Sequence, residues 1–188
     1  MLVTIGEFRK YAIITGFKHV KIRNKEEFLK KIRKEKQSNV EIQLFDAKSV
    51  ATWQHLYFAL LNALTAFKNS ENISKSLAME TMIYASAQRQ IRKATELIGI
   101  GNGTSEIALL IVGDNSETLK SALSMTSENI NMKNDDDVLE LSEEKQKIVR
   151  GKFRISDLEL KTIMKKDDLS EALINLVIER MALLTTQR

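Results

Sequence analysis

Glu106-Ile-Ala-Leu-Leu-Ile-Val112 is an unbroken apolar run with the length of one β-strand in this 188-residue chain. Such a run is typical of a strand that is covered on both faces of a sheet. Outward from it, strand-like and helix-like segments alternate. This order predicts an α/β or α+β layered fold, in which a small sheet packs with several helices. The length suits one domain, so we expect residues 1–188 to form a single domain.

The segments on either side of this run carry strand and helix patterns of their own. Further strands are predicted over 11–15, 17–22 and 40–45, with Gly16 separating the first two. Helices are predicted over 26–36, 48–68, 74–85, 88–98, 114–128 and 169–184, with a short one beginning at Ser156. The expected helix boundaries are Asp46, Ser74, Asp114-x-x-Glu117 and Ser156-x-x-Glu159 at N-termini, and Gly99 at a C-terminus. Residues 131–150 are rich in Asn, Asp and Lys, which predicts an exposed, partly mobile insertion.

Composition excludes several classes of protein. The chain has no cysteine and two histidines, too few for a disulfide framework, a zinc–thiolate site or a His-rich metal site. We see no apolar run long enough for a membrane span and no secretory signal, so we expect a cytoplasmic protein, or a nuclear one in a eukaryote. The net charge is +4, but residues 9–36 hold eleven Lys or Arg against three Glu, a net charge of +8.

Motifs for catalysis and for cofactor binding are not found. Gly99-Ile-Gly-Asn-Gly103 lies in the order helix, loop, strand, whereas a dinucleotide loop follows a strand and opens a helix. Asp135-Asp-Asp137 lacks the alternating ligands of a calcium loop, and no partner positions His55 for acid–base work. His55 is placed away from most of the apolar stripe of its helix. We therefore expect no enzyme activity, no cofactor and no metal, and interpret the chain as a binding protein.

The last helix is apolar on nearly every side. Its first apolar row is sufficient to pack one face of the helix. Ile174, Ile178 and Met181 then form a second row at helical spacing, which indicates either a docked partner or a fully internal helix. Without its partner, such a helix could also pair two copies of the chain as a homodimer.

Ala85-Ser-Ala-Gln-Arg-Gln-Ile91, followed by Arg92 and Lys93, forms the second candidate surface. Small residues mark a break between two helices, and Gln and Arg begin the new helix. A helix N-terminus attracts anions, and Arg is a bidentate phosphate donor. Amide side chains can read base edges or ribose hydroxyls. The alternative is an ordinary helix–helix turn with solvated charges.

These residues, together with Phe45-Asp-Ala-Lys-Ser-Val-Ala51, His55, Ser76-x-x-Met79-Glu80 and the terminal Ile178-Glu-Arg-Met-Ala-Leu-Leu184, resemble a known family. It is the PRPK-binding (TPRKB-like) small subunit of the KEOPS tRNA-modification complex. The likeness covers roughly residues 40–128 and the final twenty. Ala87 stands where the family pattern leads us to expect glycine.

The resemblance implies a non-catalytic subunit that binds the small atypical kinase of the complex, supports its ATPase activity and engages the single-stranded CCA end of tRNA. The complex installs threonylcarbamoyl on adenosine. Carried over by motif, the tRNA-binding residues are Ser86, Gln88, Arg89, Gln90, Ile91, Arg92 and Lys93. Kinase docking is placed on Ile174, Ile178 and Met181 by helix geometry. A plain protein-interaction domain without RNA binding is the alternative, and an enzyme using the 99–103 loop is a third, less favoured reading.

Overall fold

The structure, a computed structural model, describes residues 1–34, 39–165 and 168–186. Its centre is a four-stranded sheet in the order β1-β2-β4-β3, with every pairing antiparallel. The strands are β1 (Leu2–Ile5), β2 (Lys10–Phe17), β3 (Val40–Asp46) and β4 (Ile107–Gly113). All seven residues of β4 are buried, which confirms the strand predicted from the apolar run. The fold is a single-domain α+β fold, because the strands are antiparallel although helices separate most of them in the chain.

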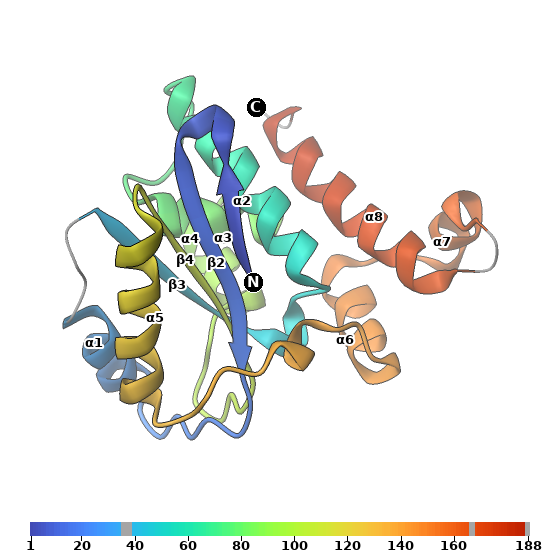
Figure 1. The fold of residues 1–188 in the computed structure, drawn as a ribbon. Coiled ribbons are helices and arrows are strands. Elements are labelled where there is room, and N and C mark those ends of the chain that lie inside the picture. The colour runs from blue at the N-terminus through green and yellow to red at the C-terminus, as the bar shows by residue number, and fades with distance from the viewer. Residues whose placement is uncertain (35–38, 166–167, 187–188) are drawn as a thin grey trace.

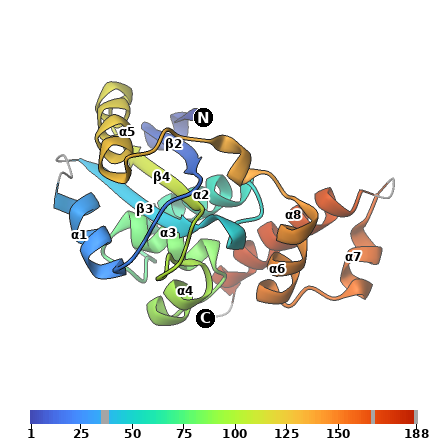
Figure 2. The ribbon, with the colours of Figure 1, turned by 90° about the horizontal axis from the view of Figure 1, so that it is seen from below.

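Helices cover both faces of the sheet (Figure 1). One face is covered by α2 (Trp53–Lys68), α3 (Leu77–Ala85) and α4 (Ile91–Ile98), and the other by α1 (Lys25–Lys34) and α5 (Ser116–Ile130). An arm follows, made of α6 (Glu143–Phe153), α7 (Asp157–Ile163) and α8 (Leu169–Ala182). Figure 2 shows this arm to one side of the sheet, and α8 returns to pack on α2. Short 3-10 turns are η1 (Gly6–Phe8), η2 (Ala47–Ser49), η3 (Asp136–Leu139) and η4 (Leu183–Thr186).

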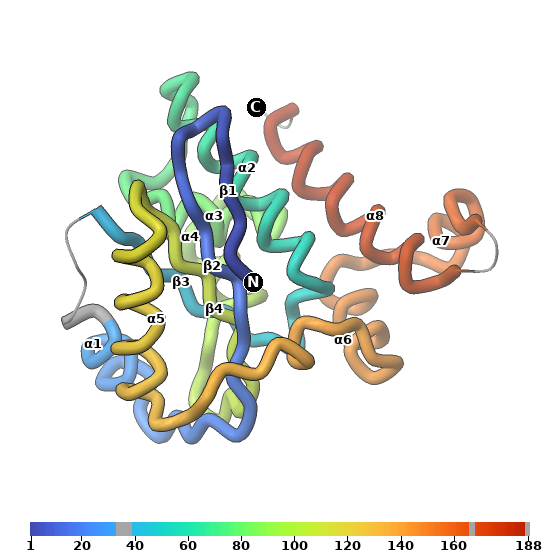
Figure 3. Tube along the Cα trace, viewed as in Figure 1, coloured from blue at the N-terminus to red at the C-terminus, as the bar shows by residue number. Residues whose placement is uncertain are grey.

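The predicted strand over 17–22 is wrong, because β2 continues through Gly16 and ends at Phe17. A glycine is needed at position 16 for close packing rather than for a turn. A Cβ there would lie 1.9 Å from Cγ2 of Val138 and 2.9 Å from the carbonyl oxygen of Asp135. The backbone N–H of Asp135 donates to the carbonyl of Gly16 at 2.7 Å. The segment after α5 therefore lies directly on the strand, and Figure 3 shows it crossing β2 on the way to α6.

The segment 131–150 has ten exposed residues, as predicted for an exposed insertion, but four of its residues are buried. Val138, Leu139 and Val149 are buried in the main core. Lys145 is also buried, and its Nζ donates to the carbonyls of Val138 at 2.7 Å and Glu140 at 3.1 Å. Burial lowers the pKa of this amine to about 8. The acidic run misled the prediction because its apolar neighbours, rather than its charges, determine the packing.

Several predicted helix boundaries move by a few residues. Ser76, rather than Ser74, caps α3, since the N–H of Ser74 donates to the buried carboxylate of Glu80 at 2.6 Å. Asn115 caps α5, whereas Asp114 pairs with Lys10. The capping box at Ser156 is confirmed. The helix predicted over 26–36 is α1, and residues 35 and 36 lie outside the described residues.

Candidate functional site

The turn between α3 and α4 is closed by backbone hydrogen bonds of the Schellman type. The N–H of Gln88 donates to the carbonyl of Ile83 at 3.2 Å, and that of Ala87 donates to Tyr84 at 2.8 Å. Ala87 has a φ of 50°, in the left-handed region that glycine adopts without strain. The glycine expected at this position thus corresponds to a backbone requirement. Alanine meets that requirement at an energetic cost of about 1 kcal/mol.

We expect Ala87→Gly to stabilise the protein by about 1 kcal/mol, since it removes the left-handed strain. The melting temperature should rise by roughly 2–4 °C in a thermal unfolding scan. Ala182→Gly, at the end of α8 with ordinary helical geometry, is the matched control and should destabilise. A lower melting temperature for Ala87→Gly would show that the turn is not strained.

The side chain of His55 is hydrogen-bonded to the last residue of α3, directly before this turn. Its ring is fully buried, with Nδ1 accepting from the N–H of Ala51 at 3.1 Å and Nε2 donating to the carbonyl of Ala85 at 2.7 Å. The ring edge meets Phe153 of α6 at 5.5 Å between centroids. Burial lowers the pKa of His55 to about 4, so the imidazole is neutral. The expectation that it faces away from the apolar side is wrong; it links α2, α3 and α6.

A cleft of about 600 Å³ opens beside the turn. It is lined by residues of the α3–α4 region, α6, the segment after α6, and α8: Ser86, Ala87, Gln88, Lys93, Glu96, Leu97, Lys152, Phe153, Arg154 and Arg180. Four of these side chains are cationic and one is acidic, so the cleft is net positive. We call it the basic cleft.

Three of the four cations were missed by sequence reasoning. Lys152 Nζ donates to the carbonyl of Leu97 at 2.6 Å and to the hydroxyl of Ser49 at 2.5 Å, which ties α6 to the end of α4. The guanidinium of Arg180 forms an ion pair with the carboxylate of Glu159 at 2.5 Å. Arg154 is exposed at the left-handed C-cap of α6. No local motif marks these residues, because the tertiary fold brings them to a turn more than fifty residues earlier in the chain.

The residues predicted from the motif divide into three groups. Ser86 is buried at the wall of the basic cleft, and its hydroxyl donates to the carbonyl of Ile83 at 2.9 Å, so an RNA contact by this side chain stays a prediction. Gln88 and Lys93 line the basic cleft. The others lie outside it on exposed positions: Arg89, Gln90, Ile91 and Arg92.

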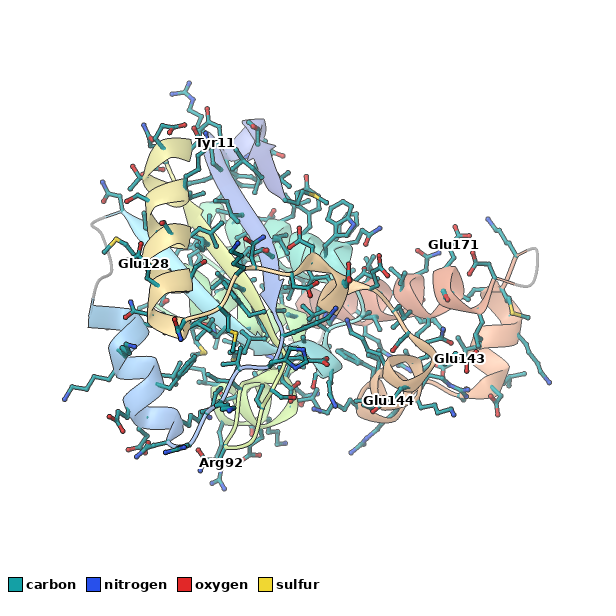
Figure 4. All side chains as sticks on the ribbon, turned by 60° about the horizontal axis from the view of Figure 1, so that its bottom comes forward. Tyr11, Arg92, Glu128, Glu143, Glu144 and Glu171 are labelled. Carbon is teal, nitrogen blue, oxygen red and sulfur yellow. The ribbon has the colours of Figure 1, made fainter. Side chains whose placement is uncertain are left out.

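The start of α4 is open to an anion. The helix begins at Ile91, not at Gln88 as predicted, and Gln90 at its N-cap makes no side-chain capping bond. Its first N–H groups therefore have no side-chain cap. Ile91 is 44% exposed beside them. Arg92 pairs with Glu96 at 2.8 Å and extends into solvent, as Figure 4 shows.

Helix α8 presents only part of the predicted docking row. Met181 is fully buried, so the prediction of a docking role is wrong for it. Ile174 and Ile178 are half-buried at the edge of the core, as are Trp53, Tyr57 and Leu61 of α2. Since α2 and α8 pack together, we group these half-buried apolar side chains as the α2–α8 face. Phe58, 39% exposed and edge-on to Tyr57, extends it.

The remaining motifs have structural explanations. Gly99 is extended rather than left-handed, and a Cβ there would lie 2.5 Å from the carbonyl oxygen of Thr95. Asp135 and Asp137 both pair with Lys18. Within the described ranges, no group of three acidic, His or Cys side chains could hold a metal ion, and no helix is long and apolar enough to cross a membrane.

Two comparisons with known proteins bear on this arrangement. A family model described as kinase binding protein CGI-121 matches residues 17–185. The chain is also 32% identical over 116 residues to the regulatory protein Cgi121 of Methanocaldococcus jannaschii. That alignment covers 62% of this chain and 72% of the relative. The family match begins at the last residue of β2 and includes β3, β4, the basic cleft and the α2–α8 face.

Proposed function

This chain belongs to the CGI-121 family of kinase binding proteins, and we propose that it is the small, non-catalytic subunit of a KEOPS-type complex. In this role it binds the small atypical kinase, supports the kinase's ATPase activity and holds the 3′ CCA end of tRNA. Other subunits then form threonylcarbamoyladenosine on the tRNA. Kinase binding rests on the family match, and the RNA role rests on the basic cleft beside the α3–α4 turn.

The basic cleft suits the end of an RNA strand. Its volume of about 600 Å³ accommodates one or two nucleotides, and Lys93, Lys152 and Arg154 at its wall offset backbone charge, whereas Arg180 is paired with Glu159. The uncapped N–H groups of α4 supply further donors for a phosphate. Gln88 lies in the cleft and Gln90 beside it, where amides can pair with a base or a ribose.

The exposed motif residues extend this site outward. Ile91 offers an apolar surface on which one base can rest, and Arg89 is assigned to the phosphate that follows. Arg92 and Lys93 add sequence-independent attraction, which weakens as salt rises. The result is a site for an unpaired end, because base and backbone contacts lie together within one turn.

The RNA role is tested by measuring the affinity of the protein for tRNA with and without its CCA tail. Fluorescence anisotropy at fixed salt reports the binding. We expect removal of the tail to weaken binding by at least about tenfold, since the tail carries the base contacts. Equal affinity for the two tRNAs would refute the CCA role. If neither tRNA binds, the chain is instead a protein-interaction domain that binds the kinase and no RNA.

Kinase docking is assigned to the α2–α8 face. Half-buried apolar side chains at a helix edge are typical anchors of a protein interface. We expect Ile178→Glu to weaken kinase binding about thirtyfold, as buried interface anchors do, while the fold persists because Ile178 lies at the edge of the core. Titration calorimetry with the purified kinase measures this change.

The matched control adds the same charge on the opposite side of the sheet. Ser124→Glu lies at an exposed position of α5 and should leave kinase affinity unchanged. If Ile178→Glu binds as well as the native protein, docking lies elsewhere. If the free native chain sediments as a dimer that Ile178→Glu dissociates, the same face also supports self-association.

A further inference from the structure

A second cationic surface lies on the other side of α4. Residues 8–25 contain six Lys or Arg and no Asp or Glu. Three cations from this stretch, together with Lys30 of α1, define what we call the basic surface: Lys21, Arg23, Lys25 and Lys30. None of them belongs to the basic cleft or to the motif between α3 and α4.

The fold holds this surface in a defined geometry. Val20 and Ile22 are buried in the core under α1 and α5, so the alternate residues Lys21 and Arg23 point to solvent. The N–H of Val20 donates to the carbonyl of Ser105 at 2.9 Å, and the N–H of Gly103 donates to that of Ile22 at 3.2 Å. Although this segment is not a strand, its backbone is anchored like one.

The charges of the basic surface are not neutralised by ion pairs with any residue that the structure describes. Lys18, just before it, pairs with Asp135 at 3.1 Å and Asp137 at 3.2 Å. Among the residues that the structure describes, none of the four cations has such a pair, and residues 99–105 alongside are uncharged. Glu26 and Glu27 on the first turn of α1 are the acids nearest in sequence. Residues 21–30 hold four cations against these two acids, a net charge of +2, which favours an anionic partner.

The basic surface is joined to the basic cleft through α4. Residues 99–105, which hold the segment of Lys21 and Arg23, follow directly from the C-terminus of α4, while Lys93 of the cleft stands in its first turn. Eight helical residues span only about 12 Å. Figures 2 and 4 show α1, the segment before it and α4 along one edge of the molecule. One RNA molecule can therefore reach both surfaces.

We propose that the basic surface binds the phosphate backbone of the RNA duplex next to the single-stranded 3′ end. This inference rests on the proposed function of the basic cleft. A duplex, rather than more single strand, fits because residues 18–31 hold a single Phe, Tyr or Trp, and that residue, Phe28, is half-buried against the core. Cations without stacking platforms position a backbone and do not read bases.

The experiment compares three labelled RNAs: a hairpin with a four-nucleotide 3′ tail, the same hairpin without the tail, and the tail alone. The variant is Lys21→Gln with Arg23→Gln, which removes two charges from exposed positions. We expect it to bind both hairpins roughly tenfold more weakly in 0.1 M salt and to bind the tail alone as the native protein does. The slope of the logarithm of hairpin affinity against the logarithm of salt concentration should become shallower by the amount expected for about two lost phosphate contacts.

The control variant is Lys75→Gln with Lys161→Gln, which removes one exposed charge just before α3 and one in α7. It should bind all three RNAs unchanged. The proposal is overturned if the first variant loses affinity for the tail as well, if it loses none for the hairpins, or if the control loses as much. Displacement of the hairpin by polyglutamate at equal charge would also overturn it, in favour of an acidic protein partner.

The same data separate this proposal from the function on which it rests. If the native protein binds tailed and untailed hairpins equally, the CCA role fails. A tenfold loss of untailed-hairpin binding by Lys21→Gln with Arg23→Gln would still support the basic surface.

Discussion

Replacing His55 by alanine is expected to destabilise the protein by about 4 kcal/mol. The imidazole is fully buried, and its loss leaves a cavity against Phe153. It also leaves the N–H of Ala51 and the carbonyl of Ala85 without their partner, and each unpaired buried group adds about 1–3 kcal/mol. Urea unfolding of the purified protein measures the difference. A loss below about 1 kcal/mol would show that the histidine is not a structural link.

The pH dependence of stability gives an independent check on the same side chain. The pKa of His55 is lowered to about 4 in the fold, against an ordinary value of 6.5. Its contribution is therefore complete above pH 6.5 and is lost as the pH falls from 6.5 to 4, because the unfolded chain takes up the proton first. The full change is about 3 kcal/mol.

The remaining histidine supplies the control for that titration. His19 is exposed and has a φ of 58°, so His19→Asn keeps a residue that tolerates left-handed backbone. This variant should retain the acid sensitivity of the native protein between pH 6.5 and 4, whereas His55→Gln should lose most of it. If both variants behave alike, carboxylates rather than His55 dominate the acid transition.

Reversing two charges of the basic cleft should have the largest effect on RNA binding. Lys93 and Arg154 line the cleft from α4 and from the end of α6, and both are exposed. We expect Lys93→Glu with Arg154→Glu to weaken binding of CCA-ended tRNA about a hundredfold in 0.1 M salt, because two attractive contacts become repulsive. Stability should change little, since neither side chain packs in the core.

The matched control reverses two exposed charges away from the cleft, with Lys75→Glu and Lys161→Glu. It changes the net charge by the same amount, so any general loss of attraction appears in both variants. A larger loss in the cleft variant identifies the site. Equal losses would mean that RNA binding follows net charge alone, and the cleft would then have no particular part in it.

The turn at Ala87 and the link at His55 explain how one site depends on distant parts of the chain. His55 holds the carbonyl of Ala85 at the end of α3, and Ala87 then reverses the chain in the left-handed region. Phe153 contacts the His55 ring and also lines the basic cleft. Packing in the core therefore determines how the α3–α4 turn lies relative to the cations of the basic cleft.

The sequence alone determined the central strand, the layered fold and the position of the α3–α4 turn. These features are local: the apolar run of 107–113 requires cover on both faces, and periodic apolar residues require helices. The resemblance to a kinase-binding family was also carried by local motifs, and the family match confirms it.

Only the tertiary structure decided which residues share a surface. Gly16 suggested a break in the chain, but it permits Val138 to lie on β2, and Val138 and Leu139 next to the acidic run are buried in the core. Met181 and Ser86 are buried, whereas Lys152, Arg154 and Arg180 reach the cleft from far along the chain. Periodicity shows that a residue is apolar or charged. Whether it is covered depends on neighbours distant in sequence, because burial is a property of the packed chain.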